Sequence, residues 1–189
     1  MLWSTLRRQA LAGLLALAAP IALAAQSPCP RGVLPAYAHN DYENKQPLND
    51  ALTLGFRGAE ADVFLVNGVL RVGHDRRAAR TGGSLEALYL APLRALVARC
   101  GKLTADGGPF FLALEVKENS AATHDSLVAL LGLYHELLDA PQSAGRGMPP
   151  VHMVLVGWHP MTPFSDSATQ AKVGWQHRIT AANRDHPAQ

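Results

Sequence analysis

Short apolar runs and longer amphipathic segments alternate along this chain. Four runs have the length and composition of strands: residues 34–38, 58–66, 110–116 and 151–156. Three segments between them place apolar residues at helical spacing: residues 47–54, 84–99 and 121–138. Strands that alternate with helices build βαβ units, so the pattern predicts an α/β fold with a parallel sheet.

Turn and capping residues refine these elements. Asn67-Gly68 follows the second run, and this dipeptide is the strongest short-range signal for a hairpin. Ser84 is suited to cap the second helix. Pro92 is expected to divide that helix in two, because a proline inside a helix removes a hydrogen bond. The basic, glycine-containing stretch 76–83 is expected to be a loop.

The first 25 residues have the organisation of a targeting segment. Arg7-Arg8 precede an apolar run from 11 to 25 that ends in small residues, which is the order of a secretory signal peptide. A membrane anchor is the alternative, although the run is short and Pro20 interrupts it. Residues 1–25 are therefore interpreted as a signal peptide and residues 26–189 as a single α/β domain. We expect a secreted or periplasmic protein with no stable membrane span after removal of the signal.

Cys29 and Cys100 are the two cysteines of the chain, and both lie in the part that would be exported. In an oxidising compartment a disulfide between them can persist. Two separate thiols remain the alternative, because sequence alone does not supply the geometry of the bridge. No cysteine spacing typical of a metal site occurs.

The charge balance gives no support to polyanionic partners. The formal net charge is +2 at pH 7, from 17 basic and 15 acidic residues. Removing the two arginines of the signal peptide leaves 15 basic residues against 15 acidic ones. Nothing in this balance favours nucleic acid or an anionic membrane as a general partner.

Three carboxylates lie at positions where they are not expected to stabilise the fold. Glu60 and Asp62 lie two residues apart on a predicted strand and therefore share a face. Glu115 interrupts the run 110–116, which is otherwise apolar, as in a strand buried on both faces. Two neighbouring carboxylates repel each other unless a cation or protons lie between them. Carboxylate oxygens suit Mg²⁺ or Ca²⁺ rather than zinc.

Two histidines follow predicted strands. His39 comes after the first strand and His74 after the hairpin. Parallel α/β folds build their sites at the carboxyl ends of strands, and histidine exchanges a proton near neutral pH. The pair is therefore suited to acid–base catalysis, with loop positions that have no role as the alternative.

The order of these residues resembles the phospholipase-C-like phosphodiesterases, which include glycerophosphodiester phosphodiesterases and spider-venom sphingomyelinase D. The matching pieces are His39, the E-x-D of Glu60 and Asp62, the His-Asp of residues 74–75, and the E-x-K of residues 115–117. The wording A-H-N-D-Y at 38–42 and S-L-E-A-L-Y-L at 84–90 is closer to a subgroup that includes the altered-inheritance-of-mitochondria protein of yeast and secreted bacterial relatives. The resemblance covers roughly residues 34–120.

The resemblance implies metal-assisted cleavage of glycerophosphodiester- or phospholipid-like substrates on a (β/α)₈ TIM barrel. Glu60, Asp62 and Glu115 would hold one divalent cation, Mg²⁺ or Ca²⁺. His39 and His74 would be general base and general acid. The partner would be a small phosphodiester or a phospholipid-derived substrate.

The resemblance also implies residues that contact the substrate. Lys117 would add positive charge near the phosphate. Asn40 stands where glycerophosphodiesterases usually carry an arginine, so the phosphate would be held by Arg57, Arg76 or Arg77, or the substrate would differ. Asn40 and Arg76 are therefore included with Lys117 as expected substrate contacts.

The length of the chain limits how much of a barrel it can form. A (β/α)₈ barrel typically needs about 250 residues, whereas 164 of the 189 remain after the first 25. From His159 onward the periodicity fades, so only about the first four βα units are expected. Two functions follow as alternatives: a metal-dependent phosphodiester hydrolase, or a catalytically inactive remnant or metal-binding protein of the same fold.

Overall fold

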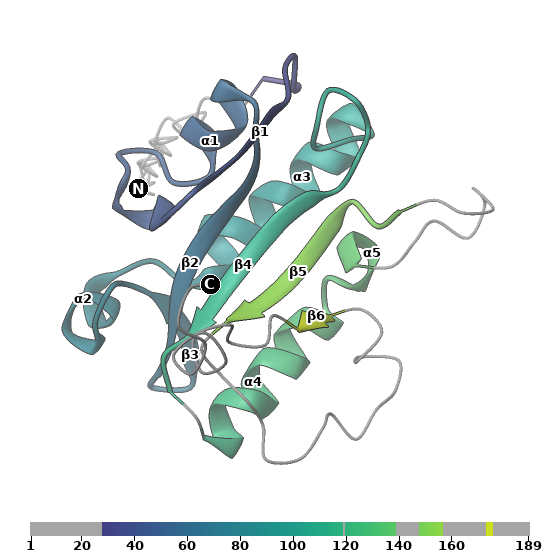
Figure 1. The fold of residues 1–189 in the computed structure, drawn as a ribbon. Helices are drawn as coiled ribbons and strands as arrows, with labels where there is room; N and C mark the ends of the chain where they lie inside the picture. Colours follow the sequence, from purple (N-terminus) through teal and green to yellow (C-terminus); the bar gives the residue numbers. More distant parts are fainter. Residues whose placement is uncertain (1–27, 119, 139–147, 157–172, 176–189) are drawn as a thin grey trace, which may run out of the picture.

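A computed structural model describes residues 28–118, 120–138, 148–156 and 173–175 (Figure 1). The signal peptide predicted for residues 1–25 lies outside these ranges, so the structure does not test it. Among the described residues, no helix is both long enough and apolar enough to cross a membrane.

A mostly parallel sheet forms the centre of the described structure. Five parallel strands follow one another in chain order across it: β1 (Leu34–Ala38), β2 (Phe56–Val66), β4 (Phe110–Val116), β5 (Val151–Val156) and β6 (Val173–Trp175). The short strand β3 (Val69–Val72) pairs antiparallel with β2 through the hairpin at Asn67-Gly68. The predicted α/β class, parallel sheet and hairpin are therefore confirmed.

Helical segments connect the strands. In chain order they are η1 (Asp41–Glu43), α1 (Asn49–Leu54), α2 (Arg76–Thr81), the π-helical turn η2 (Glu86–Leu90), α3 (Ala91–Cys100), α4 (Ala121–Gly132) and α5 (His135–Leu138). In Figure 1, α3 and α4 lie behind the sheet formed by β2, β4 and β5. The helices α3 and α4 therefore cover the same face of the sheet.

One face of each central strand packs into the core with these helices. The residues that form this face alternate along the strands: Ala59, Ala61 and Val63 in β2, Phe110, Leu112 and Leu114 in β4, and Val151, Met153 and Leu155 in β5. Because side chains alternate between the two faces of a strand, Glu60, Asp62 and Glu115 point to the opposite face. On that face Phe111 is 37% exposed, so the expectation that β4 is buried on both faces is wrong for the described structure.

Residues 76–100 refine the sequence-based expectations. Residues 76–81 form α2 rather than a loop, because the Asp75 side chain accepts a hydrogen bond from the Ala78 backbone N–H at 2.7 Å and so caps the helix. The following helical segment is divided in two, as expected, but the division into η2 and α3 falls just before Pro92, which lies in the first turn of α3. The π-helical turn runs directly into that first turn, and Ser84 caps it as predicted, 3.1 Å from the Ala87 N–H.

Two further differences concern the second half of the chain. The segment expected as one helix over 121–138 breaks after Gly132 into α4 and α5. The strand β6 lies beyond the point where periodicity fades, and it pairs with β5. Its three residues are too few to produce an alternating pattern, and the middle one is glycine.

A disulfide joins Cys29, before β1, to Cys100 at the end of α3, with the two Cα atoms 5.7 Å apart. This bridge confirms the pairing left open by the sequence. It closes a loop with a sequence separation of 71 residues, and long closed loops restrict the unfolded chain most strongly.

Replacing both cysteines by serine should lower the free energy of unfolding. The restricted entropy of a loop of this size corresponds to about 4 kcal/mol in the chain-entropy model. Urea denaturation of the double variant and of the wild type, each in oxidised buffer, measures the difference. Equal midpoints for the two proteins would contradict the stabilising role of the bridge.

Candidate functional site

The polar side chains of the predicted site gather at the carboxyl ends of neighbouring strands. His39 directly follows β1, and Glu60 and Asp62 lie within β2. Pairing of β2 with β4 places Asp62 beside Glu115. His74 follows β3, and Lys117 follows β4. The structure thus brings these six residues to one edge of the sheet.

Three carboxylates form a compact cluster there. One oxygen from each of Glu60, Asp62 and Glu115 lies within 4.8 Å of the others. Asp62 is 1% exposed, and its buried Oδ1 has no hydrogen-bond partner among the described residues. A buried carboxylate oxygen without a donor is costly, so this atom has the surroundings expected of a cation ligand.

The donor set fits a hard divalent cation. All three groups offer oxygen, which Mg²⁺ and Ca²⁺ prefer. Two oxygens on one Ca²⁺ are at most about 5 Å apart and two on one Mg²⁺ about 4 Å apart, given the usual metal–oxygen distances. The cluster is therefore a suitable place for one hard divalent cation.

Lys117 supplies the positive charge that the cluster has in this structure. Its Nζ lies 2.8 Å from Glu115 Oε2 and 3.1 Å from Asp62 Oδ2. Desolvation lowers the pKa of Lys117, but the hydrogen bonds and charges of the two carboxylates outweigh it, so the net pKa is raised. Lys117 is therefore charged at neutral pH and bridges two of the three candidate ligands.

Each predicted catalytic histidine contacts one of the strand carboxylates. His39 Nε2 lies 3.4 Å from Glu60 Oε2, and His74 Nδ1 lies 3.5 Å from Asp62 Oδ2. Their side chains are 70% and 65% exposed, so both rings are open to solvent and to a ligand. The second ring nitrogen, Nδ1 of His39 and Nε2 of His74, does not make this contact.

Tyr42 belongs to this arrangement, although the sequence argument used it only as part of a motif. Its hydroxyl donates a hydrogen bond to Asp62 Oδ2 at 2.9 Å and lies 3.4 Å from His74 Nδ1. Burial and the Asp62 carboxylate raise the pKa of Tyr42, so the phenol keeps its proton. Tyr42 is thereby a fixed donor between a candidate metal ligand and a candidate catalytic histidine.

The loop after β1 approaches the cluster through its backbone. Asn40 adopts a left-handed conformation with φ of 48°, which asparagine tolerates better than most residues. Its N–H donates to Glu60 Oε2 at 3.4 Å, a long contact. The structure therefore places Asn40 beside the site with its backbone, whereas the sequence suggested a side-chain contact with substrate.

Asp41 anchors this loop from inside the protein. Its carboxylate is fully buried and accepts hydrogen bonds from the Leu48 N–H, from the Tyr89 hydroxyl at 3.0 Å and from the Asn44 side-chain amide at 3.5 Å. These donors come from the connection to α1 and from the π-helical turn. Asp41 thus fixes the segment that carries its neighbours Asn40 and Tyr42.

The donor Leu48 has an unusual backbone conformation. It has φ of 63° and ψ of −46°, and Asn49 N–H donates to Pro47 C=O across it at 2.7 Å. This is a γ-turn with positive φ, which is strained for a leucine. The strain is compensated because the turn buries the Leu48 side chain and directs its N–H at Asp41.

The arginines proposed for phosphate binding lie in two separate places, with Arg76 and Arg77 consecutive in α2 and Arg57 in β2. Arg76, at the start of α2, forms an ion pair with Glu118, which directly follows Lys117. Arg57, near the start of β2, pairs with Asp106 before β4, at the opposite end of the strands. The structure thus brings Arg76 next to the site but not Arg57.

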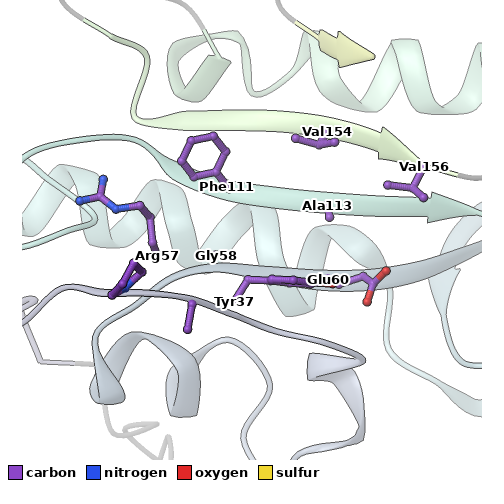
Figure 2. A pocket seen from close by; sticks show the side chains of 10 residues that line it. Tyr37, Arg57, Gly58, Glu60, Phe111, Ala113, Val154 and Val156 are labelled. Atoms are coloured by element: carbon purple, nitrogen blue, oxygen red, sulfur yellow. The ribbon is translucent and has the colours of Figure 1, made fainter. Parts of the chain in front are cut away.

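A groove of about 510 Å³ runs along the open face of the sheet from Glu60 (Figure 2). Its walls are mostly apolar and come from β1, β2, β4 and β5, with Tyr37, Phe111, Val154 and Val156 among the lining residues. Arg57 lies at the end away from Glu60. The carboxylate cluster therefore adjoins an apolar surface.

Comparisons with known proteins identify a match in the first part of the chain. Residues 30–107 match the AIM6-like phosphodiesterase domain. Over 71 residues the chain is 41% identical to the altered inheritance of mitochondria protein 6 homolog of Arthroderma benhamiae, covering 33% of this chain and 23% of that protein. Over 59 residues it is 41% identical to altered inheritance of mitochondria protein 6 of Eremothecium gossypii, covering 30% of this chain and 15% of that protein. No solved structure gives a significant match.

These matches confirm the resemblance to phosphodiesterase-like proteins that the motifs predict. The chain spans less than a quarter of the length of these curated relatives. The region matched by the domain includes His39, the Glu60–Asp62 pair and His74, whereas Glu115 and Lys117 lie beyond its end at residue 107.

Lys117→Met should destabilise the metal-free protein. The substitution leaves the buried Asp62 without its ammonium partner, which should cost about 1–3 kcal/mol in the free energy of unfolding. Because a divalent cation can replace the lost charge, adding Ca²⁺ should raise the melting temperature of this variant more than that of the wild type. Lys102→Met is the matched control, since Lys102 contacts only the Ala105 carbonyl. Equal responses of the two variants to Ca²⁺ would refute this role of Lys117.

Tyr89→Phe should weaken the buried anchor at Asp41. Burial raises the pKa of Asp41 above its usual 3.8, although its hydrogen bonds lower it. Removing the Tyr89 donor should cost about 1–3 kcal/mol at neutral pH. The loss should shrink as the pH falls through the raised pKa, because a protonated carboxyl is the weaker acceptor.

The sign of the pH dependence follows from the linkage between proton binding and folding. A raised folded-state pKa means that the contribution of Asp41 to stability is fully present below pH 3.8 and is lost as the pH rises through the folded pKa. Urea unfolding at neutral and at acidic pH measures both effects. Tyr37→Phe is the control, because Tyr37 is 56% exposed. A loss that is the same at both pH values would contradict the assignment to Asp41.

Proposed function

We propose that this protein is a metal-dependent phosphodiester hydrolase that acts on small phosphodiesters or phospholipid-derived substrates. The observation that carries the proposal is the cluster of Glu60, Asp62 and Glu115 with a histidine on either side. The match to a phosphodiesterase domain supports the same reaction class. The apolar groove beside Glu60 supports substrates that carry an apolar substituent.

In the proposed reaction, the two histidines exchange protons with the substrate. One of His39 and His74 removes the proton from the attacking hydroxyl, and the other donates a proton to the leaving oxygen. His74 Nδ1 faces Asp62 and Tyr42, so Nε2 is the nitrogen proposed to exchange the proton. Contact with a carboxylate orients each ring.

Glu60, Asp62 and Glu115 would hold the cation, Mg²⁺ or Ca²⁺, which supplies Lewis-acid stabilisation of negative charge on the phosphoryl oxygens when bound. In the structure Lys117 bridges Asp62 and Glu115. In the loaded protein its ammonium would be available to the phosphate. Asn40 and Arg76 complete the proposed substrate contacts.

We further propose that the fold is the first part of a (β/α)₈ barrel. The parallel strands follow one another in chain order without reversal, and this order supports a barrel over a doubly wound sheet. We also propose that the chain is exported to the periplasm or the medium. The disulfide supports an oxidising compartment.

Hydrolysis of bis(p-nitrophenyl) phosphate tests the proposed reaction. Activity should require a divalent cation and disappear with EDTA. His74→Ala should lower kcat by about 10²–10⁴, the usual weight of acid–base catalysis. His135→Ala is the matched control, because His135 is also 65% exposed but lies on α5. If His39→Ala and His74→Ala both keep wild-type turnover, the proposed mechanism is wrong.

A cation-binding protein without hydrolase activity is the second candidate. The high exposure of His39 and His74 favours it, because acid–base catalysis gains from a site that excludes water. A folded protein that binds Ca²⁺ but shows no EDTA-sensitive hydrolysis of glycerophosphodiesters or of bis(p-nitrophenyl) phosphate would support this alternative.

A further inference from the structure

A second cavity, of about 430 Å³, lies between the β2–β3 hairpin and α2, which are neighbours in Figure 1. Its lining residues are Val66, Asn67, Val69, Arg71, Arg76 and Arg80. Three of these six side chains are guanidinium groups and none is a carboxylate. The cavity therefore concentrates positive charge and contains no member of the carboxylate cluster.

The walls of this cavity are held in place by packing and hydrogen bonds. Phe64 and Val66 of the hairpin pack against Ala79 of α2. The Val72 N–H donates to the Gly83 carbonyl at 2.9 Å, and Arg71 Nη1 donates to the Gly82 carbonyl at 2.7 Å. The hairpin is thus tied to α2 and to the two glycines that follow it.

The three arginines are only partly neutralised. Arg76 pairs with Glu118, and Arg71 uses one nitrogen on a carbonyl. Arg80 has no hydrogen-bond or ion-pair partner among the described residues. A single carboxylate therefore faces three guanidinium groups. Like charges brought together in this way repel each other, and a multiply charged anion removes that repulsion.

The chemistry of the lining selects the class of ligand. Guanidinium groups bind phosphate oxygens through paired, charge-assisted hydrogen bonds. The Asn67 side chain offers a further amide donor. The volume is within the range usual for small-molecule sites and exceeds what one phosphate needs, so the cavity has room for a phosphate with a small organic group attached.

We propose that this cavity binds a phosphate-type dianion through Arg71, Arg76 and Arg80. The dianion is either a second phosphate group of the substrate or free inorganic phosphate. The substrate source rests on the proposed hydrolase function. In chain order Arg76 comes two residues after His74, and its partner Glu118 follows Lys117, so the segments that carry these two proposed site residues also carry a wall of the cavity and its charge partner.

Calorimetric titration of inorganic phosphate into the full-length protein in EDTA and low salt tests the binding itself. EDTA keeps phosphate from binding through a cation at the carboxylate cluster. Arg80→Ala should weaken phosphate binding about tenfold or more, as expected for the loss of a charge-assisted donor. Arg80 has no described protein partner, so this variant should keep its fold, which circular dichroism checks.

Two further variants test whether phosphate binds in the cavity itself or is attracted by the general positive charge of α2. Arg77→Ala removes the same charge from the same helix, but Arg77 does not line the cavity, so its phosphate affinity should match the wild type. Glu118→Gln releases Arg76 and should tighten phosphate binding. Equal weakening by the Arg77 and Arg80 variants, or no phosphate binding by the wild type in EDTA, would overturn the proposal.

Kinetics then distinguish the two sources of the dianion. Two p-nitrophenyl phosphodiesters are compared, one of which carries an additional phosphomonoester. If Arg80→Ala raises KM only for the substrate with the extra phosphate, the ligand is part of the substrate. If it raises KM for neither, the ligand is free phosphate. An equal rise for both would refute a separate site, and the titration in EDTA still decides the binding if the protein proves to have no hydrolase activity.

Discussion

The burial of Glu60 and Asp62 side by side is the constraint on which the rest of this structure depends. Asp62 has almost no exposure to water, and both carboxylates project from the same face of β2. Such a pair is tolerated only where donors and positive charge surround it. Lys117 provides such a contact from the segment after β4, and Tyr42 and the Asn40 backbone provide theirs from the loop after β1. The positions of these segments thus follow from one electrostatic requirement.

In the loop after β1, consecutive residues meet this requirement by contacting different partners. His39 contacts Glu60 from the solvent side, and Tyr42 contacts Asp62 from within. Asp41, between them, accepts hydrogen bonds from Leu48, in the connection to α1, and from Tyr89, in the π-helical turn. A structural carboxylate therefore maintains the positions of groups proposed to work in catalysis, and the strained turn at Leu48 is part of the same anchor.

Much of the fold could be predicted because its signals are local. The alternation of apolar runs gave the order of strands and helices, and Asn67-Gly68 gave the hairpin. The helix α2 was missed, although Asp75 followed by helix-forming residues is a recognisable start. For the candidate site, the sequence supplied only the types of the residues and their spacing along the chain. The parts that could not be predicted, such as the contact of Tyr89 with Asp41 across 48 positions, depend on tertiary packing that leaves no periodic pattern.

The pairing of β2 with β4 has a consequence for how the protein can fail to fold. Asp62 lies opposite Glu115 in this pairing, and Lys117 follows on the same strand face. A slip of one residue would turn Glu115 and Lys117 towards the helices and bring apolar side chains to the carboxylates. The misregistered sheet would keep a similar number of backbone hydrogen bonds but would lose the carboxylate cluster that is proposed to hold a cation. If the proposed site binds a divalent ion, the affinity for that ion would report correct strand register, independently of any reaction.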